Sequence, residues 1–318
     1  MTRAVVLDLA TITNGDLDLS ALDAALPGWV GYPVTRADEL HARIADAEVV
    51  LTNKIRLDRA AFDASPALRL VCLAATGTNN VDLVAARERG IAVANLRGYC
   101  TASVAQHVFA LILALTIDIP GYRRLLDDGA WRDSPQFCLL DYPVRELAGK
   151  VLGIVGYGEL GRATARIGEA FGMSVLVAER PGAGAQAGRV PLPELLARAD
   201  VVSLHCPLTD ATRGLIDAAA LQRMKPDALL INTARGALVD EAALAAALRA
   251  GAIGGAGIDV LSEEPPVHGN PLLDGAIPHL IVTPHIAWAA REARQRAVDE
   301  MAANARAFLA GEARNRVI

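Results

Sequence analysis

The fold of this 318-residue chain is decided by one short stretch, Val151-Leu152-Gly153-Ile154-Val155-Gly156-Tyr157-Gly158-Glu159-Leu160-Gly161. Residues 151–155 are apolar on both faces, which is typical of a parallel strand buried on two sides. Apolar residues then recur with helical spacing at Ala163, Ile167, Ala170 and Phe171. The pattern predicts a strand, a glycine turn and a helix, in that order.

The three glycines are spaced as in a turn that binds a dinucleotide. Gly156 permits the tight turn, Gly158 lets the backbone approach a pyrophosphate, and Gly161 lets the helix pack close to the strand. The helix N-terminus then offers free N–H groups and partial positive charge to phosphates. Glycine-rich turns also end ordinary strands, but Glu179 stands about 20 residues beyond the first glycine, after a second apolar run at Val175–Ala178. This combination favours nucleotide binding.

Composition limits the class of protein. A chain of 318 residues with 53% hydrophobic residues is long and apolar enough for two compact domains. Its net charge of −5, without a long basic run, argues against nucleic acid or an anionic membrane surface as partner. The four cysteines are scattered, so we expect reduced thiols, no metal site and a cytoplasmic location. Val108–Ile117 is too short to span a bilayer and is expected to be a buried helix.

The first third of the chain predicts an α/β unit. Short apolar runs stand at residues 4–9, 47–53, 68–75 and 91–95, and alanine- and leucine-rich stretches such as Leu19–Leu26 and Val81–Arg89 lie between them. This alternation predicts a parallel sheet. A long helix is expected at Thr101–Leu115, with Thr101 or Ser103 as its N-cap. Residues 120–149 are rich in turn signals and are expected to form an irregular connection that is functional or interfacial.

The second unit repeats the alternation from Val151 onward. Its apolar runs are 151–155, 173–178, 200–204, 228–232, 256–260 and 280–283. Helices are expected between them at Pro193–Arg198, Asp217–Met224 and Glu241–Ala250. The pattern predicts a six-stranded doubly wound sheet. A last amphipathic helix, Arg291–Leu309, follows the final strand and could return to pack on the first unit.

Polar residues follow several of these strands, where ligands of open α/β sheets bind. Arg235 comes after the run at 228–232, and its guanidinium is suited to holding a carboxylate. His285 comes after the run at 280–283, and Glu264 lies in the loop between the runs at 256–260 and 280–283. Each residue alone has an ordinary explanation as a surface or loop side chain. Their expected position at one edge of the sheet, with the glycine turn, favours a shared site.

At these residues the sequence resembles the D-isomer-specific 2-hydroxy-acid dehydrogenases over nearly its whole length. The matching motifs are Gly156–Gly161, His205-Cys206-Pro207-Leu208-Thr209, Asn232–Gly236, Gly257–Val260 followed by Glu264-Pro265-Pro266, and Thr283–Trp288. Ala75–Asp82 and Thr283–Trp288 look most like the glycerate dehydrogenase, or hydroxypyruvate reductase, branch.

The resemblance implies two Rossmann-like doubly wound parallel-sheet domains. A flavodoxin-like, split substrate domain would comprise residues 1–98 and 289–318, and a dinucleotide-binding domain residues 99–288. It also implies a homodimer. In such enzymes the residue that matches Arg235 holds the substrate, the one that matches His285 exchanges the proton, and the one that matches Glu264 orients the histidine. These residue types suit the chemistry because hydride addition to a 2-oxo acid leaves an alkoxide that must be protonated, and histidine titrates near neutrality.

The resemblance extends to binding residues. The cofactor contacts it implies are Gly156, Gly158, Glu159, Leu160, Gly161, Glu179, Arg180, His205, Cys206, Pro207, Thr233, Ala234, Arg235, Asp259 and His285. Substrate contacts are expected from Thr76, Gly77, Thr78, Arg235 and His285, because the turn at residues 75–78 follows a strand and its N–H groups could form an anion nest.

Two questions stay open at the level of sequence. Glu179 at the end of its strand would bind the ribose hydroxyls of NAD and repel the 2′-phosphate of NADP, but Arg180 could accommodate that phosphate, so NAD is favoured and NADP is possible. The function expected is interconversion of hydroxypyruvate or glyoxylate with D-glycerate or glycolate. The alternatives are a non-catalytic NAD(H)-sensing protein on the same fold and a phosphite- or formate-type dehydrogenase.

Overall fold

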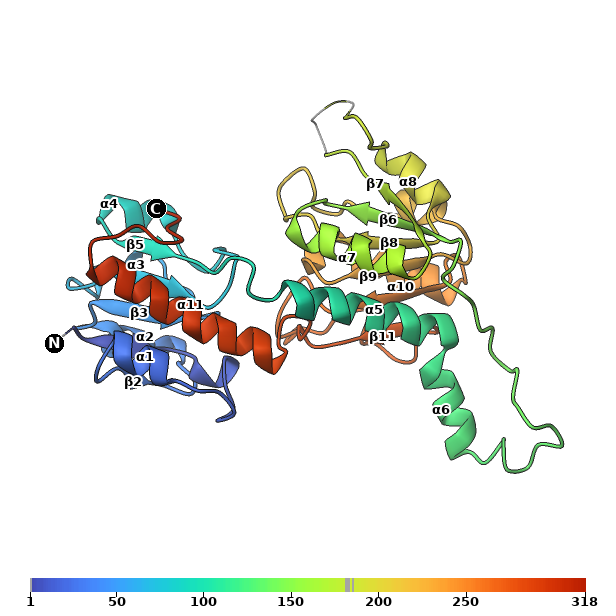
Figure 1. Cartoon of the computed structure of the whole chain (residues 1–318), viewed down its shortest axis with the longest axis horizontal. Helices are drawn as coiled ribbons and strands as arrows, with labels where there is room; N and C mark the ends of the chain where they lie inside the picture. Colours follow the sequence, from blue (N-terminus) through green and yellow to red (C-terminus); the bar gives the residue numbers. More distant parts are fainter. Residues whose placement is uncertain (1, 181–183, 185) are drawn as a thin grey trace. The chain divides into compact units, whose positions relative to one another are not determined.

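A computed structural model describes residues 2–180, 184 and 186–318, and in it the chain divides into two compact units. Unit 1 comprises Met1–Cys100 and Ala289–Ile318, and unit 2 comprises Thr101–Trp288. Each unit is built on its own parallel sheet with helices on both faces (Figure 1). The predicted fold class, two doubly wound α/β domains, is confirmed.

Unit 1 contains a five-stranded sheet. Its strands are β1 (Ala4–Val6), β2 (Val30–Gly31), β3 (Val49–Thr52), β4 (Leu70–Leu73) and β5 (Ala92–Ala94), in the order β2-β1-β3-β4-β5. All neighbours are parallel, and the order is that of flavodoxin-like sheets. The apolar runs predicted four of the strands. The exposed, two-residue edge strand β2 was not predicted, because it buries no apolar face that would give it a pattern.

Two helical layers cover this sheet. The helices are α1 (Ser20–Ala25), α2 (Ala37–Ile44), α3 (Arg59–Asp63), α4 (Leu83–Glu88) and α11 (Arg291–Leu309), with a 3-10 turn at Leu9–Thr11. Buried side chains of α2, α3 and α4 form one core with the sheet. On the other face, α11 packs on β4 and α1 (Figure 1). The expected return of the C-terminal helix to the first unit is therefore confirmed.

Unit 2 contains the six predicted strands. They are β6 (Val151–Val155), β7 (Ser174–Val177), β8 (Val201–Leu204), β9 (Leu229–Asn232), β10 (Gly255–Ile258) and β11 (Leu280–Val282), all parallel in the order β11-β10-β9-β8-β6-β7. An isolated parallel β-bridge joins Ala178, directly after β7, to Val190. The two strands that follow β6 in the chain lie on its opposite sides, β7 on one side and β8 on the other. This order places a switch point between β6 and β8.

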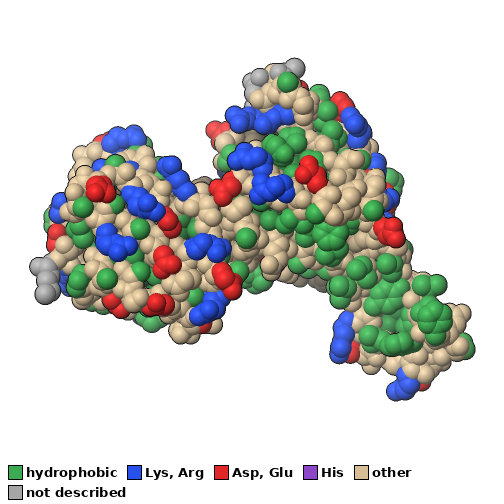
Figure 2. All heavy atoms as spheres, in the orientation of Figure 1, with side chains coloured by type: hydrophobic (Ala, Val, Ile, Leu, Met, Phe, Trp, Pro, Cys, Tyr) green, Lys and Arg blue, Asp and Glu red, His purple; other side chains and the backbone are tan. Residues whose placement is uncertain are grey.

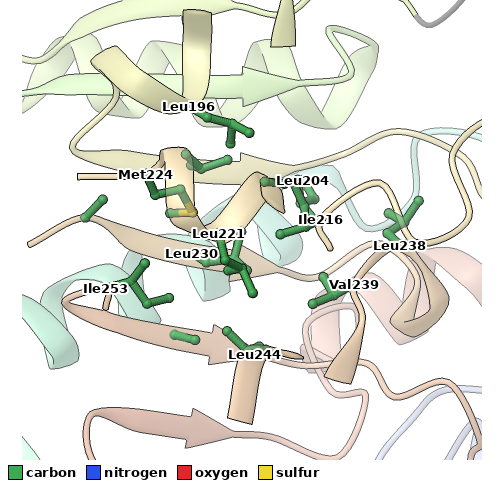
Figure 3. Packing of buried hydrophobic residues seen from close by; sticks show 14 of the residues in the cluster. Leu196, Leu204, Ile216, Leu221, Met224, Leu230, Leu238, Val239, Leu244 and Ile253 are labelled. Carbon is green, nitrogen blue, oxygen red and sulfur yellow. The ribbon is translucent and has the colours of Figure 1, made fainter. Parts of the chain in front are cut away.

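Helices cover both faces of this sheet as well. They are α5 (Thr101–Ile117), α6 (Ile119–Asp127), α7 (Glu159–Ala170), α8 (Leu192–Arg198), α9 (Ala218–Arg223) and α10 (Glu241–Arg249), with a 3-10 turn at Gly236–Leu238. The face beneath α8, α9 and α10 holds a large apolar core in which Leu196, Leu221 and Leu244 meet side chains from the strands (Figure 3). Helices α5 and α7 pack together on the other side, where the rings of Phe109 and Phe171 stack at 5.3 Å.

The structure corrects two predictions around α5. Residues 120–127, expected to be irregular, belong to α6, because Asp118 caps the helix through Gly121 N–H and Pro120 fits its first turn. Helix α5 begins at Thr101 itself, so Thr101 is its first residue and Ser103 lies inside the first turn, and neither of them is the N-cap. Its hydroxyl donates to Ala287 O at 2.6 Å.

In the described part of the chain, none of the helices taken singly has the length and apolar character needed to cross a membrane, although the consecutive pair α5 and α6, bent by 55°, meets that test together.

Candidate active site

The glycine turn lies against the end of β8. Gly156 has φ of +98°, and a Cβ on it would lie 2.5 Å from Cys206 N, so only glycine fits there. His205 N–H donates to Val155 O at 2.7 Å, which joins the two strand ends. A Cβ on Gly161 would overlap Gly156 O, so the start of α7 closes tightly on the turn. The turn therefore stands at the switch point between β6 and β8.

The residues around this turn fit a dinucleotide. A Cβ added at Gly158 would meet no atom within 4 Å, so the backbone there is open to a ligand. Glu159 and Leu160 begin α7 directly beyond it, which aims the helix N-terminus at this space. Within the described residues, two buried polar atoms of the predicted cofactor set, His205 Nδ1 and Thr233 Oγ1, have no hydrogen-bond partner. Buried polar groups are rarely left unpaired, so these atoms are consistent with a polar ligand.

His205 and Cys206 are both electrically neutral near pH 7. Burial lowers the pKa of His205 from 6.5 to about 4, and its Nε2 lies 2.9 Å from Ser203 Oγ. Burial raises the pKa of the Cys206 thiol to about 11. Pro207 follows on the exposed side. This part of the site offers neutral hydrogen-bonding groups and no charge.

Glu179 and Arg180 follow β7 at the same edge of the sheet. Glu179 N–H donates to Val190 O at 2.9 Å, and its Oε1 accepts from Gln186 N–H at 3.3 Å. Arg180 N–H donates to Gln186 Oε1 at 3.1 Å. Gln186 thus holds the backbone at Arg180 and one oxygen of Glu179. The carboxylate stands at the end of the strand, as expected from the sequence.

Arg235 is presented by a turn that leaves β9. Asn232 fixes this turn, because its Nδ2 donates to Arg235 O at 2.9 Å and its Oδ1 accepts from Ala234 N–H at 3.0 Å. A Cβ on Gly236 would overlap the carbonyl carbon of Leu261, so glycine allows the turn to touch the loop after β10. Arg235 Nη1 donates to Ala234 O at 2.6 Å. Among the described residues, no carboxylate lies within ion-pair distance of the Arg235 guanidinium.

Glu264 and His285 form a direct pair. His285 Nδ1 and Glu264 Oε2 are 2.6 Å apart, and about a quarter to a third of each side chain is exposed, 26% and 33%. The other oxygen of Glu264 accepts from Leu261 N–H at 2.9 Å, which fixes the carboxylate. His285 has a left-handed backbone with φ of +55°, which is uncommon for any residue but glycine.

The three predicted catalytic residues are therefore brought to one edge of unit 2. Arg235, the Glu264 loop and His285 follow β9, β10 and β11, which are neighbours in the sheet. Asp259, also predicted to contact the cofactor, ends β10, and its side chain is fully buried. Within the described residues, no group of three or more His, Cys, Asp or Glu side chains could hold a metal ion.

The predicted substrate turn belongs to unit 1. Thr76, Gly77 and Thr78 follow β4, and Asn95 Nδ2 donates to Thr76 O at 2.7 Å. Leu96 N–H donates to Ala75 O at 3.0 Å. Asn95 and Leu96, which directly follow β5, thus hold the turn at the carboxyl edge of its own sheet.

Sequence reasoning missed His107 and Thr283, which contact Asp259. The spacing of Ser103 and His107 was one signal of this contact. They are four residues apart and so present two polar side chains on one face of α5.

Comparison with known proteins identifies the family. The model of the D-isomer specific 2-hydroxyacid dehydrogenase NAD binding domain matches residues 109–287, more than half of the chain. A glycerate dehydrogenase of Methylorubrum extorquens is 46% identical over 278 residues, which cover 87% of this chain and 88% of the relative. A hydroxypyruvate reductase of Blautia hydrogenotrophica is 40% identical over 316 residues, 97% of each chain.

A solved structure agrees with these relatives. The NADPH-dependent glyoxylate/hydroxypyruvate reductase of Sinorhizobium meliloti superposes with a TM-score of 0.84 at 29% identity, covering 100% of this chain and 98% of that one. The chain belongs to the D-isomer-specific 2-hydroxyacid dehydrogenase family. It is an NAD-binding oxidoreductase that interconverts 2-oxo acids and 2-hydroxy acids, so the resemblance seen in the motifs, including the branch, is confirmed.

Proposed function

We propose that the enzyme reduces hydroxypyruvate or glyoxylate to D-glycerate or glycolate, and catalyses the reverse reactions, with Arg235, Glu264 and His285 as its catalytic residues. The observation that carries this assignment is the grouping of an arginine without an acidic partner in the described chain and a histidine–carboxylate pair at 2.6 Å on one sheet edge. An unneutralised guanidinium attracts an anionic substrate, and the pair supplies a proton beside it. The names of the relatives support the substrate class.

Arg235 would bind the carboxylate of the 2-oxo acid and polarise its carbonyl oxygen. A guanidinium can do both because its N–H groups form a planar fork. The bound nicotinamide nucleotide supplies or accepts the hydride. As negative charge develops on the carbonyl oxygen, His285 gives it a proton, and in the oxidative direction the same ring removes the proton of the hydroxyl.

Glu264 determines which nitrogen of His285 does this work. Its carboxylate holds Nδ1 at 2.6 Å, so Nε2 is the nitrogen left to face a substrate. Glu264 thus keeps the histidine oriented for proton transfer.

The two units have different roles in this proposal. Unit 2 would be the dinucleotide-binding domain, since the family match to that domain lies within it. Unit 1 would be the substrate domain, with the turn Thr76, Gly77 and Thr78 offering N–H groups to the substrate carboxylate. The sequence places the boundary after residue 98, and the units divide after Cys100.

We also propose that NAD is preferred to NADP. The fixed carboxylate of Glu179 would accept hydrogen bonds from the ribose hydroxyls and repel a 2′-phosphate. Its neighbour Arg180 has its N–H group bound to Gln186, while its side chain is exposed. The remaining cofactor contacts predicted from the sequence are part of this proposal, including Pro207, Ala234 and Asp259.

A homodimer is the assembly we propose, through α6 and the segment that follows it. Apolar side chains gather on this part of unit 2 (Figure 2), among them Phe137, Leu140 and Val144, which are 91%, 79% and 59% exposed. Burying such a surface against a second copy would stabilise a dimer. Light scattering should give twice the chain mass, and Phe137→Asp with Leu140→Asp should give the monomer mass. A cytoplasmic location is supported by four cysteines that are all free thiols.

The function is tested by following NADH and NADPH oxidation with hydroxypyruvate, glyoxylate, pyruvate and phenylpyruvate. Hydroxypyruvate or glyoxylate should give the highest kcat/KM, with NADH preferred. The highest kcat/KM for phenylpyruvate would refute the substrate assignment and leave the family intact. Binding of NADH without turnover of any 2-oxo acid would favour an NAD(H)-sensing role.

A further inference from the structure

A buried network lies behind His285, and two of its side chains, His107 and Thr283, belong neither to the proposed catalytic residues nor to the proposed cofactor contacts. Asp259 Oδ1 accepts from the Thr283 hydroxyl at 2.5 Å and from Ile286 N–H at 2.9 Å. Its Oδ2 accepts from Ala287 N–H at 2.9 Å. The Asp259 side chain is fully buried, so these donors take the place of water at its two oxygens. One carboxylate thereby accepts hydrogen bonds from residues before and after His285 in the sequence.

The backbone of His285 is fixed by the same strand end. His285 N–H donates to Asp259 O at 2.7 Å. A left-handed conformation costs a residue with a side chain about 1 kcal/mol or more, and it persists only where the surroundings enforce it. The bonds from Asp259 to residues 285, 286 and 287 provide that enforcement.

Helix α5 holds the network from its other side. His107 Nε2 lies 3.0 Å from Thr283 Oγ1 and 3.5 Å from Asp259 Oδ1. The Thr283 hydroxyl has one proton and gives it to Asp259, so its oxygen accepts from His107 and the proton of the ring is on Nε2. One turn earlier on α5, the Ser103 hydroxyl donates to Ala287 O at 2.6 Å. Both ends of the turn at residues 283–287 are therefore bonded to one rigid helix.

We infer that His107, Thr283 and Asp259 are positioning residues that hold His285 in the orientation required for proton transfer. The inference rests on the proposed role of His285 and adds a role for two side chains that the reaction does not contact. Asp259 is the carboxylate at the centre of this network. The Thr283 hydroxyl donates to Asp259 and accepts from His107 on α5. Loss of these hydrogen bonds should leave His285 present but misaligned, so proton transfer should slow while the nucleotide still binds.

The test compares Thr283→Val with Thr283→Ser. Valine keeps the shape and removes the hydroxyl, whereas serine keeps it. Thr283→Val should lower kcat for hydroxypyruvate reduction about tenfold, with the KM for NADH unchanged within about twofold. The solvent deuterium isotope effect on kcat should rise, because proton transfer becomes slower than the other steps. Thr283→Ser should restore kcat to within about threefold of wild type.

Thr164→Val is the matched control. Thr164 is fully buried in α7 and belongs neither to the proposed site nor to the network around His285, so loss of its hydroxyl should change neither kcat nor the isotope effect. Asp259→Asn adds a second measurement, since in either orientation its amide NH2 group would face one N–H donor, that of Ile286 or that of Ala287. In the folded fraction of Asp259→Asn, with activity expressed per molecule of bound NADH, kcat should fall further than in Thr283→Val.

The outcomes separate this inference from the proposed function. An active wild type with an inactive His285→Ala variant, but a Thr283→Val variant equal to wild type in kcat and isotope effect, overturns the positioning role alone. A His285→Ala variant that retains full activity overturns the proposed function itself. A loss of kcat in Thr283→Val that serine does not restore, or that Thr164→Val shares, would show general destabilisation and refute the inference.

Discussion

Acid should destabilise unit 2 through His205, and the size of the effect follows from its burial. The pKa of His205 is lowered from 6.5 to about 4 in the folded protein. Between these values the unfolded chain binds more protons than the folded one, so the free energy of unfolding falls as the pH falls. For that pKa difference the loss between pH 7 and pH 5 is about 2 kcal/mol, and about 3 kcal/mol by pH 4. Above pH 7 the contribution is constant.

The assay is urea unfolding of wild type and His205→Gln at pH 7 and pH 5. The variant removes the titrating ring, so its free energy of unfolding should fall by about 2 kcal/mol less than that of wild type over this range. Only the change with pH is compared, because the substitution also alters packing. His41→Gln, at an exposed position of α2, is the control and should follow wild type. Equal pH dependence in His205→Gln and wild type would refute the argument that this ring is buried in its neutral form.

Three further substitutions test the site. Arg235→Lys should lower kcat/KM for hydroxypyruvate about 10- to 100-fold, because a lysine cannot form the planar fork, and an unchanged kcat/KM would remove Arg235 from the substrate contacts. Glu264→Gln should lower kcat for reduction about tenfold with the KM for NADH unchanged, because a neutral amide accepts a weaker hydrogen bond from Nδ1 of His285 than a carboxylate does; an unchanged kcat would remove Glu264 from the catalytic residues. Glu179→Ala should raise kcat/KM for NADPH relative to NADH, and a wild type that already prefers NADPH would show that Arg180 dominates.

Much of the fold could be predicted because its signals are local. Each strand of unit 2 is a short apolar run, and the six runs match β6 to β11 within two residues at each end. Helix α6 escaped prediction because Pro120 and Gly121 are common turn residues, and only the cap made by Asp118 shows that they begin a helix. Strand β2 escaped because its two residues are exposed.

The candidate site was predictable in its residue types and in the sheet edge where they lie. Arg235 and His285 could be placed there because parallel strands bring their carboxyl ends together. The 2.6 Å contact of Glu264 with His285 depends on the fold of a loop, which spacing alone does not determine. Thr283 and His107 are about 176 residues apart in sequence, a separation over which no local pattern operates, so their contact was found only in the structure.

The proposed role of His285 as the proton donor is tested most directly by the His285→Ala variant, measured for both NADH binding and turnover. NADH binding, followed by fluorescence, should stay within about threefold of wild type, because the ring is not needed to hold the nucleotide. Reduction of hydroxypyruvate should fall by at least about 100-fold, because the proton donor is gone. A variant that binds NADH and still reduces hydroxypyruvate at the rate of wild type would show that another group supplies the proton.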